Sequence, residues 1–268
     1  MSFAIQGKTA VVTGAANGVG LAIARHFVDR GANVMFADMD EEKLIQEAAG
    51  EDGEERDGVA YFAGDLREKL TVANLLSATI DRFERVDILV NASRQMVAAD
   101  PIYDEDDAVT MLLNQNLITS LRLTQAFAKR MIKQAGDEAE APAGSIINLS
   151  SIAARRTQPN LLAYSVSSAA LDQLTRSMAV ALAQHNIRVN AIALGSVMSA
   201  SLQGAIKEHS EFRDEIVDST PLARIASASE LADVAQFLAS DGAGFITGQI
   251  ITVDGGRTLI DTVDAPAH

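Results

Sequence analysis

The stretch Lys8-Thr-Ala-Val-Val-Thr-Gly-Ala-Ala-Asn-Gly-Val-Gly20 decides how this chain is organised. Residues 10–12 form an apolar run that is typical of a buried parallel strand. Glycines at positions 14, 18 and 20 then open a turn into a helix predicted over residues 21–30. Such a turn lets a pyrophosphate approach the backbone and bind the unpaired N–H groups at the start of the helix. Three glycines alone can also make an ordinary turn, but the strand before and the helix after favour a nucleotide-binding loop.

The composition limits the classes of protein to which the chain can belong. It has 268 residues, 48% of them hydrophobic, so it can bury a large core, and it has no cysteine for disulfides or thiolate chemistry. The formal charge of −14 argues against non-specific binding to nucleic acid, which needs a basic surface. The four histidines are scattered and show no ligand spacing, so we expect no metal site. Because neither a membrane span nor a secretory signal is recognisable, we expect a cytoplasmic protein without a membrane partner.

Apolar runs alternate with helical patterns along the rest of the chain. Further strands are predicted over residues 33–37, 59–63, 87–91, 145–149, 188–194 and 249–253. Helices are predicted over residues 41–49, 69–83, 107–134, 164–184 and 229–239, with another near 202–209. This alternation predicts an α/β fold, in which one parallel sheet is covered by helices on both faces within a single domain.

Several polar residues and glycines follow directly after these strands. Ligands of such sheets bind beyond the carboxyl ends of the strands, where the strand order reverses. The loop over residues 14–20 should therefore share one crevice with the ends of the later strands. The strand-end residues in question are Asp38, Asp65, Asn91, Ser150, Ser151 and the stretch 194–199.

The spacing Thr13-Gly-x-x-x-Gly18-x-Gly20 resembles the cofactor loop of the short-chain dehydrogenase/reductase family, particularly its 3-oxoacyl-acyl carrier protein reductase-like members. The likeness runs from about Gly7 to about Leu259 and is close over Gly244–Gly256. It implies a Rossmann-like, doubly wound sheet of seven parallel strands in the order 3-2-1-4-5-6-7. It also implies that residues 1–268 form one dinucleotide-binding domain, in which residues 196–229 form a lid over the substrate.

The resemblance also implies a nicotinamide cofactor, and Asp38 favours NAD over NADP. An acidic side chain at the end of the second strand can bond the ribose hydroxyls and repels the additional phosphate of NADP. Asn17 is neutral, and no basic residue follows Asp38 until Lys43. An ordinary turn aspartate before a helix is the other interpretation of Asp38. The positions implied to bind the cofactor are Gly14, Asn17, Gly18, Val19, Gly20, Asp38, Asp65, Leu66, Asn91, Ala92, Gly195 and Val197.

The family's catalytic residues can be matched in part. The resemblance implies that Tyr164 exchanges the hydroxyl proton of the substrate, that Ser151 orients the substrate oxygen and that Asn116 anchors a water in the proton path. The family has a lysine four residues after its tyrosine, where this chain has Ser168. An unassisted tyrosine has a pKa of about 10, so we expect a weakened or atypical proton relay. Arg94, Arg155 and Arg156 are the cations that could replace the lysine.

These departures leave more than one function open. The first is an NAD(H)-dependent oxidoreductase that interconverts a small-molecule secondary alcohol and its ketone. The second is a non-catalytic nucleotide-binding protein that acts as a sensor or partner, and the third is a lyase or isomerase. The predicted helix over residues 164–184 is apolar around much of its circumference, which indicates burial in a core or by a partner. Since family members pair this helix and the helix over 107–134 across a two-fold axis, the resemblance implies a homotetramer or a homodimer.

Overall fold

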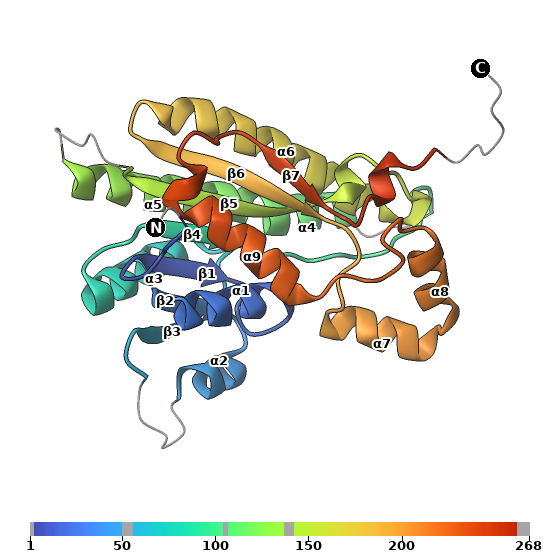
Figure 1. Cartoon of the computed structure of the whole chain (residues 1–268), viewed down its shortest axis with the longest axis horizontal. Helices are drawn as coiled ribbons and strands as arrows, with labels where there is room; N and C mark the ends of the chain where they lie inside the picture. The colour runs from blue at the N-terminus through green and yellow to red at the C-terminus, as the bar shows by residue number, and fades with distance from the viewer. Residues whose placement is uncertain (1–2, 50–55, 104–106, 137–141, 262–268) are drawn as a thin grey trace.

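The computed structural model describes residues 3–49, 56–103, 107–136 and 142–261. Seven parallel strands form one sheet in the order β3-β2-β1-β4-β5-β6-β7, as the resemblance implied (Figure 1). The predicted apolar runs form strands close to their predicted bounds. The strands are β1 (Thr9–Thr13), β2 (Asn33–Asp38), β3 (Val59–Ala63), β4 (Ile88–Asn91), β5 (Gly144–Ser151), β6 (Ile187–Leu194) and β7 (Ile250–Val253).

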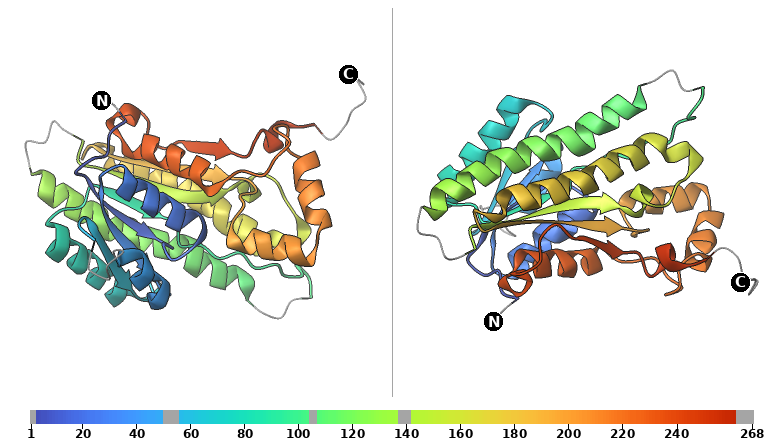
Figure 2. Two further views of the ribbon diagram at one scale, coloured as in Figure 1. Left: turned by 60° about the horizontal axis from the view of Figure 1, so that its bottom comes forward. Right: turned by 90° about the horizontal axis from the view of Figure 1, so that it is seen from above.

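Helices cover both faces of the sheet, which confirms the predicted α/β architecture (Figure 2). One apolar core lies beneath α1 (Gly18–Asp29), α2 (Glu41–Ala48) and α9 (Ala228–Ala239). The other lies beneath α3 (Lys69–Phe83), α5 (Thr119–Ala135) and α6 (Leu162–Ala183). The inner strands β1, β2, β4, β5 and β6 are buried on both faces, which explains why they appear in the sequence as largely apolar runs, whereas the edge strands β3 and β7 are only partly buried. No helix within the described ranges is long and apolar enough to cross a membrane.

The helix predicted over residues 107–134 has a widened turn inside it. Asp107 caps α4 (Ala108–Leu112) by accepting a hydrogen bond from the backbone N–H of Thr110. A π-helical turn, η1 (Leu113–Ile118), then connects α4 to α5. The hydroxyl of Ser120 donates to the carbonyl of Asn116 at 3.0 Å, so a side chain competes for the backbone acceptors of this turn. Hydrophobic periodicity does not reveal such an insertion, and π-helical turns often mark functional sites.

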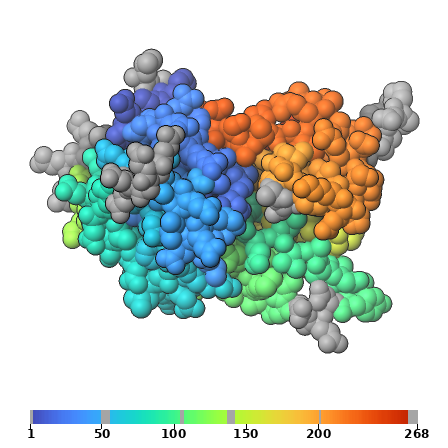
Figure 3. Space-filling view, turned by 90° about the horizontal axis from the view of Figure 1, so that it is seen from below, coloured from blue at the N-terminus to red at the C-terminus, as the bar shows by residue number. Residues whose placement is uncertain are grey.

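The segment over residues 196–229 contains two helices where one was predicted. They are α7 (Ala200–Glu208) and α8 (Glu211–Asp218), and a bridge between Val197 and Ala226 joins the two ends of the segment. Their orange surface lies beside the blue surface of the β1–α1 unit in the space-filling view (Figure 3). Short helical turns complete the described chain at η2 (Ile152–Ala154), η3 (Pro159–Leu161), η4 (Asp241–Ala243) and η5 (Arg257–Leu259).

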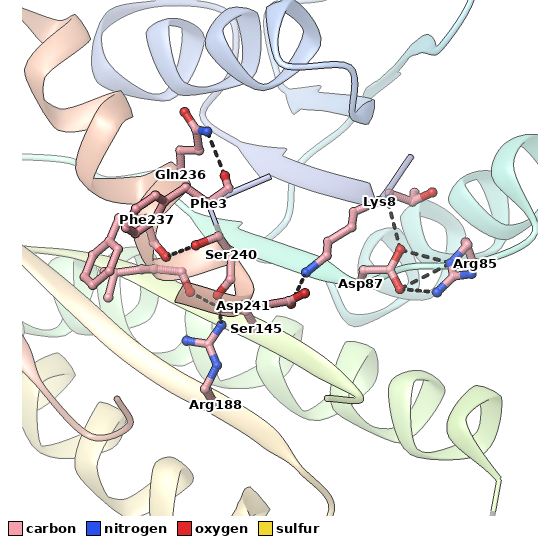
Figure 4. Close-up of polar contacts among 12 residues, drawn as sticks. Phe3, Lys8, Arg85, Asp87, Ser145, Arg188, Gln236, Phe237, Ser240 and Asp241 are labelled. Carbon is pink, nitrogen blue, oxygen red and sulfur yellow. Dashed lines mark hydrogen bonds and ion pairs between the residues drawn. The ribbon is translucent and has the colours of Figure 1, made fainter. Parts of the chain in front are cut away.

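Polar contacts join α9 and the residues after it to the amino-terminal ends of the strands (Figure 4). The predicted crevice lies at the opposite, carboxyl ends of the strands. Arg188, near the start of β6, donates to the carbonyl of Ser240 at the end of α9, and Ser145 of β5 donates to the carbonyl of Leu238. Lys8 forms an ion pair with Asp241 at 2.7 Å. These contacts tie α9 to the sheet.

Candidate active site

The loop between β1 and α1 has the close packing that its glycines predict. A Cβ atom on Gly20 would lie 2.2 Å from the carbonyl oxygen of Gly14, and a Cβ on Gly14 would lie 2.8 Å from that of Ala92. Gly14 also has a φ of +67°, which a residue with a side chain rarely adopts. The start of α1 has no side-chain cap at Asn17, so its backbone N–H groups are available to an anion. These features fit the diphosphate of a dinucleotide.

Residues after β4 hold this loop in place. The hydroxyl of Thr13 accepts hydrogen bonds from the backbone N–H groups of Ala92 and Ser93 at 3.0 and 3.1 Å. The side chain of Asn91 is buried and donates to Asn148 and Thr124, so it points into the protein and away from the crevice. If Asn91 contacts the cofactor, its backbone must make the contact.

The two acidic strand ends have different surroundings. The carboxylate of Asp38 accepts a hydrogen bond from the backbone N–H of Ala16 at 3.1 Å, which places its negative charge against the first loop. Asp65 instead forms a bidentate pair with Arg67, and the hydrogen bonds of that guanidinium lower the pKa of the Asp65 carboxyl. Leu66, the next residue, is buried.

The remaining predicted cofactor positions lie at the end of β6 and at the start of α1. Gly195 packs against Asp254, where a Cβ would approach to 2.8 Å, and Val197 is buried. Gly18 has a φ of +58°, and a Cβ on it would lie 4.0 Å from the Ser199 Cβ, the nearest heavy atom among the described residues outside its own helix and chain neighbours. Val19, Gly195 and Val197 all line a cavity of about 350 Å³. The structure therefore brings α1 and the end of β6 to one site.

The same cavity contains the two hydroxyl side chains singled out for proton transfer. Ser151 ends β5, Tyr164 lies in the first turn of α6, and both line the cavity. The Ser151 hydroxyl oxygen accepts a hydrogen bond from the backbone N–H of Ala153 at 3.1 Å, which leaves its hydrogen free to bond a substrate oxygen. Tyr164 belongs to a buried apolar cluster with Ala108, Leu112 and Ala163.

Asn116 lies in the π-helical turn and is fully buried. Its side chain accepts a hydrogen bond from the backbone N–H of Gln95 and donates to the carbonyl of the same residue, both at 2.9 Å. It also donates to the hydroxyl of Ser167 at 3.1 Å. Asn116 therefore ties the chain after β4 to α6, and its role in a proton path stays a prediction.

Of the three arginines considered as replacements for a lysine, the structure brings Arg94 to Tyr164. The guanidinium carbon of Arg94 lies 4.9 Å from the centroid of the Tyr164 ring, and the Arg94 Nη2 donates to the hydroxyl of Ser168 at 3.0 Å. Arg155 instead donates to Thr252, and Arg156 donates to the carbonyl of Thr258.

Two residues of this region were missed by sequence reasoning. Arg257, directly after Gly255-Gly256, lines the cavity and donates to the hydroxyl of Ser196 at 3.1 Å. Asp172 is buried on α6, and the hydroxyl of Ser150 donates to it at 2.5 Å. Burial raises the pKa of the Asp172 carboxyl, and the Ser150 hydrogen bond opposes that effect. Asp172 follows Ser168 by four residues, and that one-turn spacing could have indicated it.

Comparisons with known proteins agree with this geometry. A protein family described as enoyl-(acyl carrier protein) reductase matches residues 14–258. The short chain dehydrogenase/reductase astE of Aspergillus oryzae is 33% identical, with 96% of this chain and 97% of the relative covered. The cis-4-hydroxycyclohexanecarboxylate dehydrogenase of Sinomonas cyclohexanicum is 33% identical, covering 97% and 100%. A gluconate 5-dehydrogenase from Burkholderia cenocepacia, solved with NADP and tartrate, has a TM-score of 0.86 at 28% identity, covering 97% and 98%.

Proposed function

The chain belongs to the short-chain dehydrogenase/reductase family of oxidoreductases, and we therefore propose that it transfers hydride between NAD(H) and a secondary alcohol or ketone. The observation that carries this proposal is the presence of Ser151 and Tyr164 in one cavity with the start of α1. A bound nicotinamide would supply the hydride acceptor or donor. The cofactor-binding residues would be those of the first loop, Asp38 and the end of β6.

The two hydroxyl side chains would handle the proton. In alcohol oxidation, the phenolate of Tyr164 takes the hydroxyl proton while the carbinol carbon gives up its hydride, so that the alcohol becomes a ketone. The hydroxyl of Ser151 donates a hydrogen bond to the substrate oxygen and holds it towards Tyr164. Reduction runs the same steps backwards, with the Tyr164 phenol as the acid. With Ser168 where a lysine is expected, this proton relay is atypical.

The preference for NAD rests on Asp38. Its carboxylate lies against the first loop through Ala16, where it would accept hydrogen bonds from ribose hydroxyls and repel an additional phosphate. The relative from Burkholderia cenocepacia was solved with NADP, so the choice of cofactor is a property to be measured for this chain.

We further propose that the substrate carries a carboxylate or another anionic group. Arg156 and Arg257 line the cavity, and its described lining contains no acidic residue. Neither guanidinium forms an ion pair with a carboxylate among the residues that the structure describes. Two guanidinium groups can bind a carboxylate through paired hydrogen bonds. The names of the two dehydrogenase relatives from Sinomonas and Burkholderia refer to hydroxy acids, which supports this choice.

The proposal is tested by following NADH formation or consumption with paired substrates. Each secondary hydroxy acid is compared with its uncharged amide, and NAD is compared with NADP at equal concentration. We expect turnover of the acids with NAD, and Tyr164→Phe should lower kcat roughly 10²–10⁴-fold. Arg156→Gln and Arg257→Gln should raise KM for the acid and leave KM for the amide unchanged. Equal KM values for acid and amide in the unaltered protein would contradict the anionic substrate.

A non-catalytic binding role has less support, because both proton-handling hydroxyls lie in the cavity. It would gain support if NAD bound tightly and no alcohol or ketone in a broad panel reacted.

The lid function of residues 196–229 is also proposed, since Leu202 and Ala205 of α7 line the cavity. A homotetramer remains our proposal for the assembly, because the exposed side chain of Val180 on α6 offers an apolar contact surface.

A further inference from the structure

We propose that Arg94, in the connection between β4 and α4, is the positioning residue that favours the ionised form of Tyr164, with Ser168 as its anchor. This inference rests on the proposed function, because it assigns the source of positive charge beside the proton-handling phenol. It also explains how the chain could do without the family's lysine at position 168. The guanidinium of Arg94, which comes from another element, lies beside Ser168 and would supply the positive charge.

Three contacts fix the guanidinium. Its carbon lies 4.9 Å from the centroid of the Tyr164 ring, within the range at which a cation interacts with an aromatic face. Its Nη2 donates to the hydroxyl of Ser168 at 3.0 Å, and its Nη1 donates to the carbonyl of Ser150 at 2.5 Å. Arg94 therefore bridges the end of β5 and the first turns of α6, the two elements that carry Ser151 and Tyr164.

Among the residues that the structure describes, no carboxylate forms a direct ion pair with Arg94. All of its described hydrogen bonds go to uncharged oxygens, and its Nε is buried without a partner. A cation beside a phenol interacts more strongly with the phenolate than with the neutral ring, and partial burial reduces screening by water. The guanidinium therefore stabilises a negative charge on Tyr164 more than it stabilises the neutral ring.

The chain holds the backbone beside Arg94 firmly. Both backbone polar groups of Gln95, the next residue, bond the side chain of Asn116. Asn116 also donates to Ser167, the residue before the anchor Ser168. These hydrogen bonds hold the chain at Arg94 against α6, which carries Tyr164.

Other charged groups near the pair come from α6, from the chain after η2 and from η5. Burial raises the pKa of the Asp172 carboxyl on α6, while Arg155, Arg176 and Arg94 each oppose that rise. An ionised Asp172 would weaken the effect of Arg94. Arg156 and Arg257 line the cavity, but among the described residues neither makes a hydrogen bond or ring contact with Tyr164. Arg94 is therefore the cation whose removal should change the ionisation of Tyr164 most.

The first test is the pH dependence of alcohol oxidation. In Arg94→Gln, the rising limb of kcat should move up by about one to two pH units, with roughly 10- to 100-fold lower kcat at neutral pH. Arg94→Lys should retain most of the original profile, and Arg94→Gln combined with Ser168→Lys should restore it, because position 168 lies within hydrogen-bond distance of the guanidinium. An unchanged profile in Arg94→Gln would overturn the inference while leaving the oxidoreductase function intact.

A second test needs neither substrate nor cofactor. The chain has three tyrosines and no tryptophan, so Tyr61→Phe with Tyr103→Phe leaves Tyr164 as the sole source of tyrosinate absorbance. In this background, adding Arg94→Gln should move the ionisation midpoint of Tyr164 to higher pH, whereas adding Arg176→Gln, on the exposed side of α6, should move it much less. Equal midpoints with and without Arg94 would overturn the inference, even if no substrate is ever found. Melting curves of each variant would confirm that it is folded.

Discussion

At the scale of single residues, Asp38 makes a prediction about cofactor choice. Its negative charge lies against the first loop through the N–H of Ala16, so NAD should raise Tm more than NADP does at equal concentration. Asp38→Asn removes the charge, and we expect it to narrow that difference. The control is Asp40→Asn, which removes a carboxylate that pairs with Lys43 and makes no described contact with the loop. Equal shifts of Tm by both cofactors in the unaltered protein would contradict the role given to Asp38.

Asp172 makes a prediction about stability and pH. Burial raises the pKa of its carboxyl above the ordinary value of 3.8, so the folded state favours the protonated form. The resulting stability is fully present below that ordinary value and is lost as the pH rises through the folded-state pKa. Asp172→Asn cannot ionise, so it should gain stability over the unaltered protein as the pH rises, by at most about 1.4 kcal/mol per pH unit. Chemical denaturation between about pH 4 and pH 8 measures this difference.

The opposite trend for Asp172→Asn would also be informative. A variant that becomes less stable than the unaltered protein at about pH 8 would show that Asp172 is ionised there and compensates the nearby arginines. Burial would then not be the dominant influence on the pKa of the Asp172 carboxyl.

At the scale of elements, replacing glycine by alanine should have opposite effects on stability at two helical positions, one in the first turn of α1 and one in α7. Gly20→Ala should destabilise the fold by about 1–3 kcal/mol, because the new Cβ would meet the carbonyl of Gly14 at 2.2 Å. Gly204→Ala in α7 has open space around its Cβ and should stabilise the fold by up to about 1 kcal/mol. Urea denaturation of both variants checks the pair. Similar stabilities for the two variants would mean that the first turn can shift to accept a side chain.

The same elements show what the sequence could predict. A strand such as the one at residues 10–12 is a buried apolar run followed by a turn, so composition and length suffice to find it. The alternation with helices predicts parallel strands, and their order came from the family resemblance. The π-helical turn at Asn116 was not predicted, since one continuous helix was expected there and the turn involves a side-chain hydrogen bond from Ser120 to the Asn116 carbonyl. Contacts between distant elements are harder still. Arg94 and Tyr164 could be named as candidates, but their stacking depends on how a connection after β4 packs on α6.

At the scale of the whole molecule, α6 joins the cavity to the outer surface. Tyr164 near its start is buried, while Val180 near its end is 81% exposed. If the protein forms a homotetramer through α5 and α6, Val180→Glu should dissociate it, because a buried carboxylate at the interface would lose its hydration. Leu70→Glu, at a 72% exposed residue of α3, is the control and should leave the assembly unchanged. Sedimentation analysis measures both, and a monomeric unaltered protein would contradict the proposal.

The separation of Arg94 from the helix that carries Tyr164 restricts how this site could have arisen or could be altered stepwise. A lysine at position 168 beside the present Arg94 would crowd two like charges into a buried space, whereas loss of Arg94 would remove the cation that the structure places against the phenol. Each single replacement would therefore give a protein that is either strained or slow. Positions 94 and 168 should change together in related proteins that keep their activity.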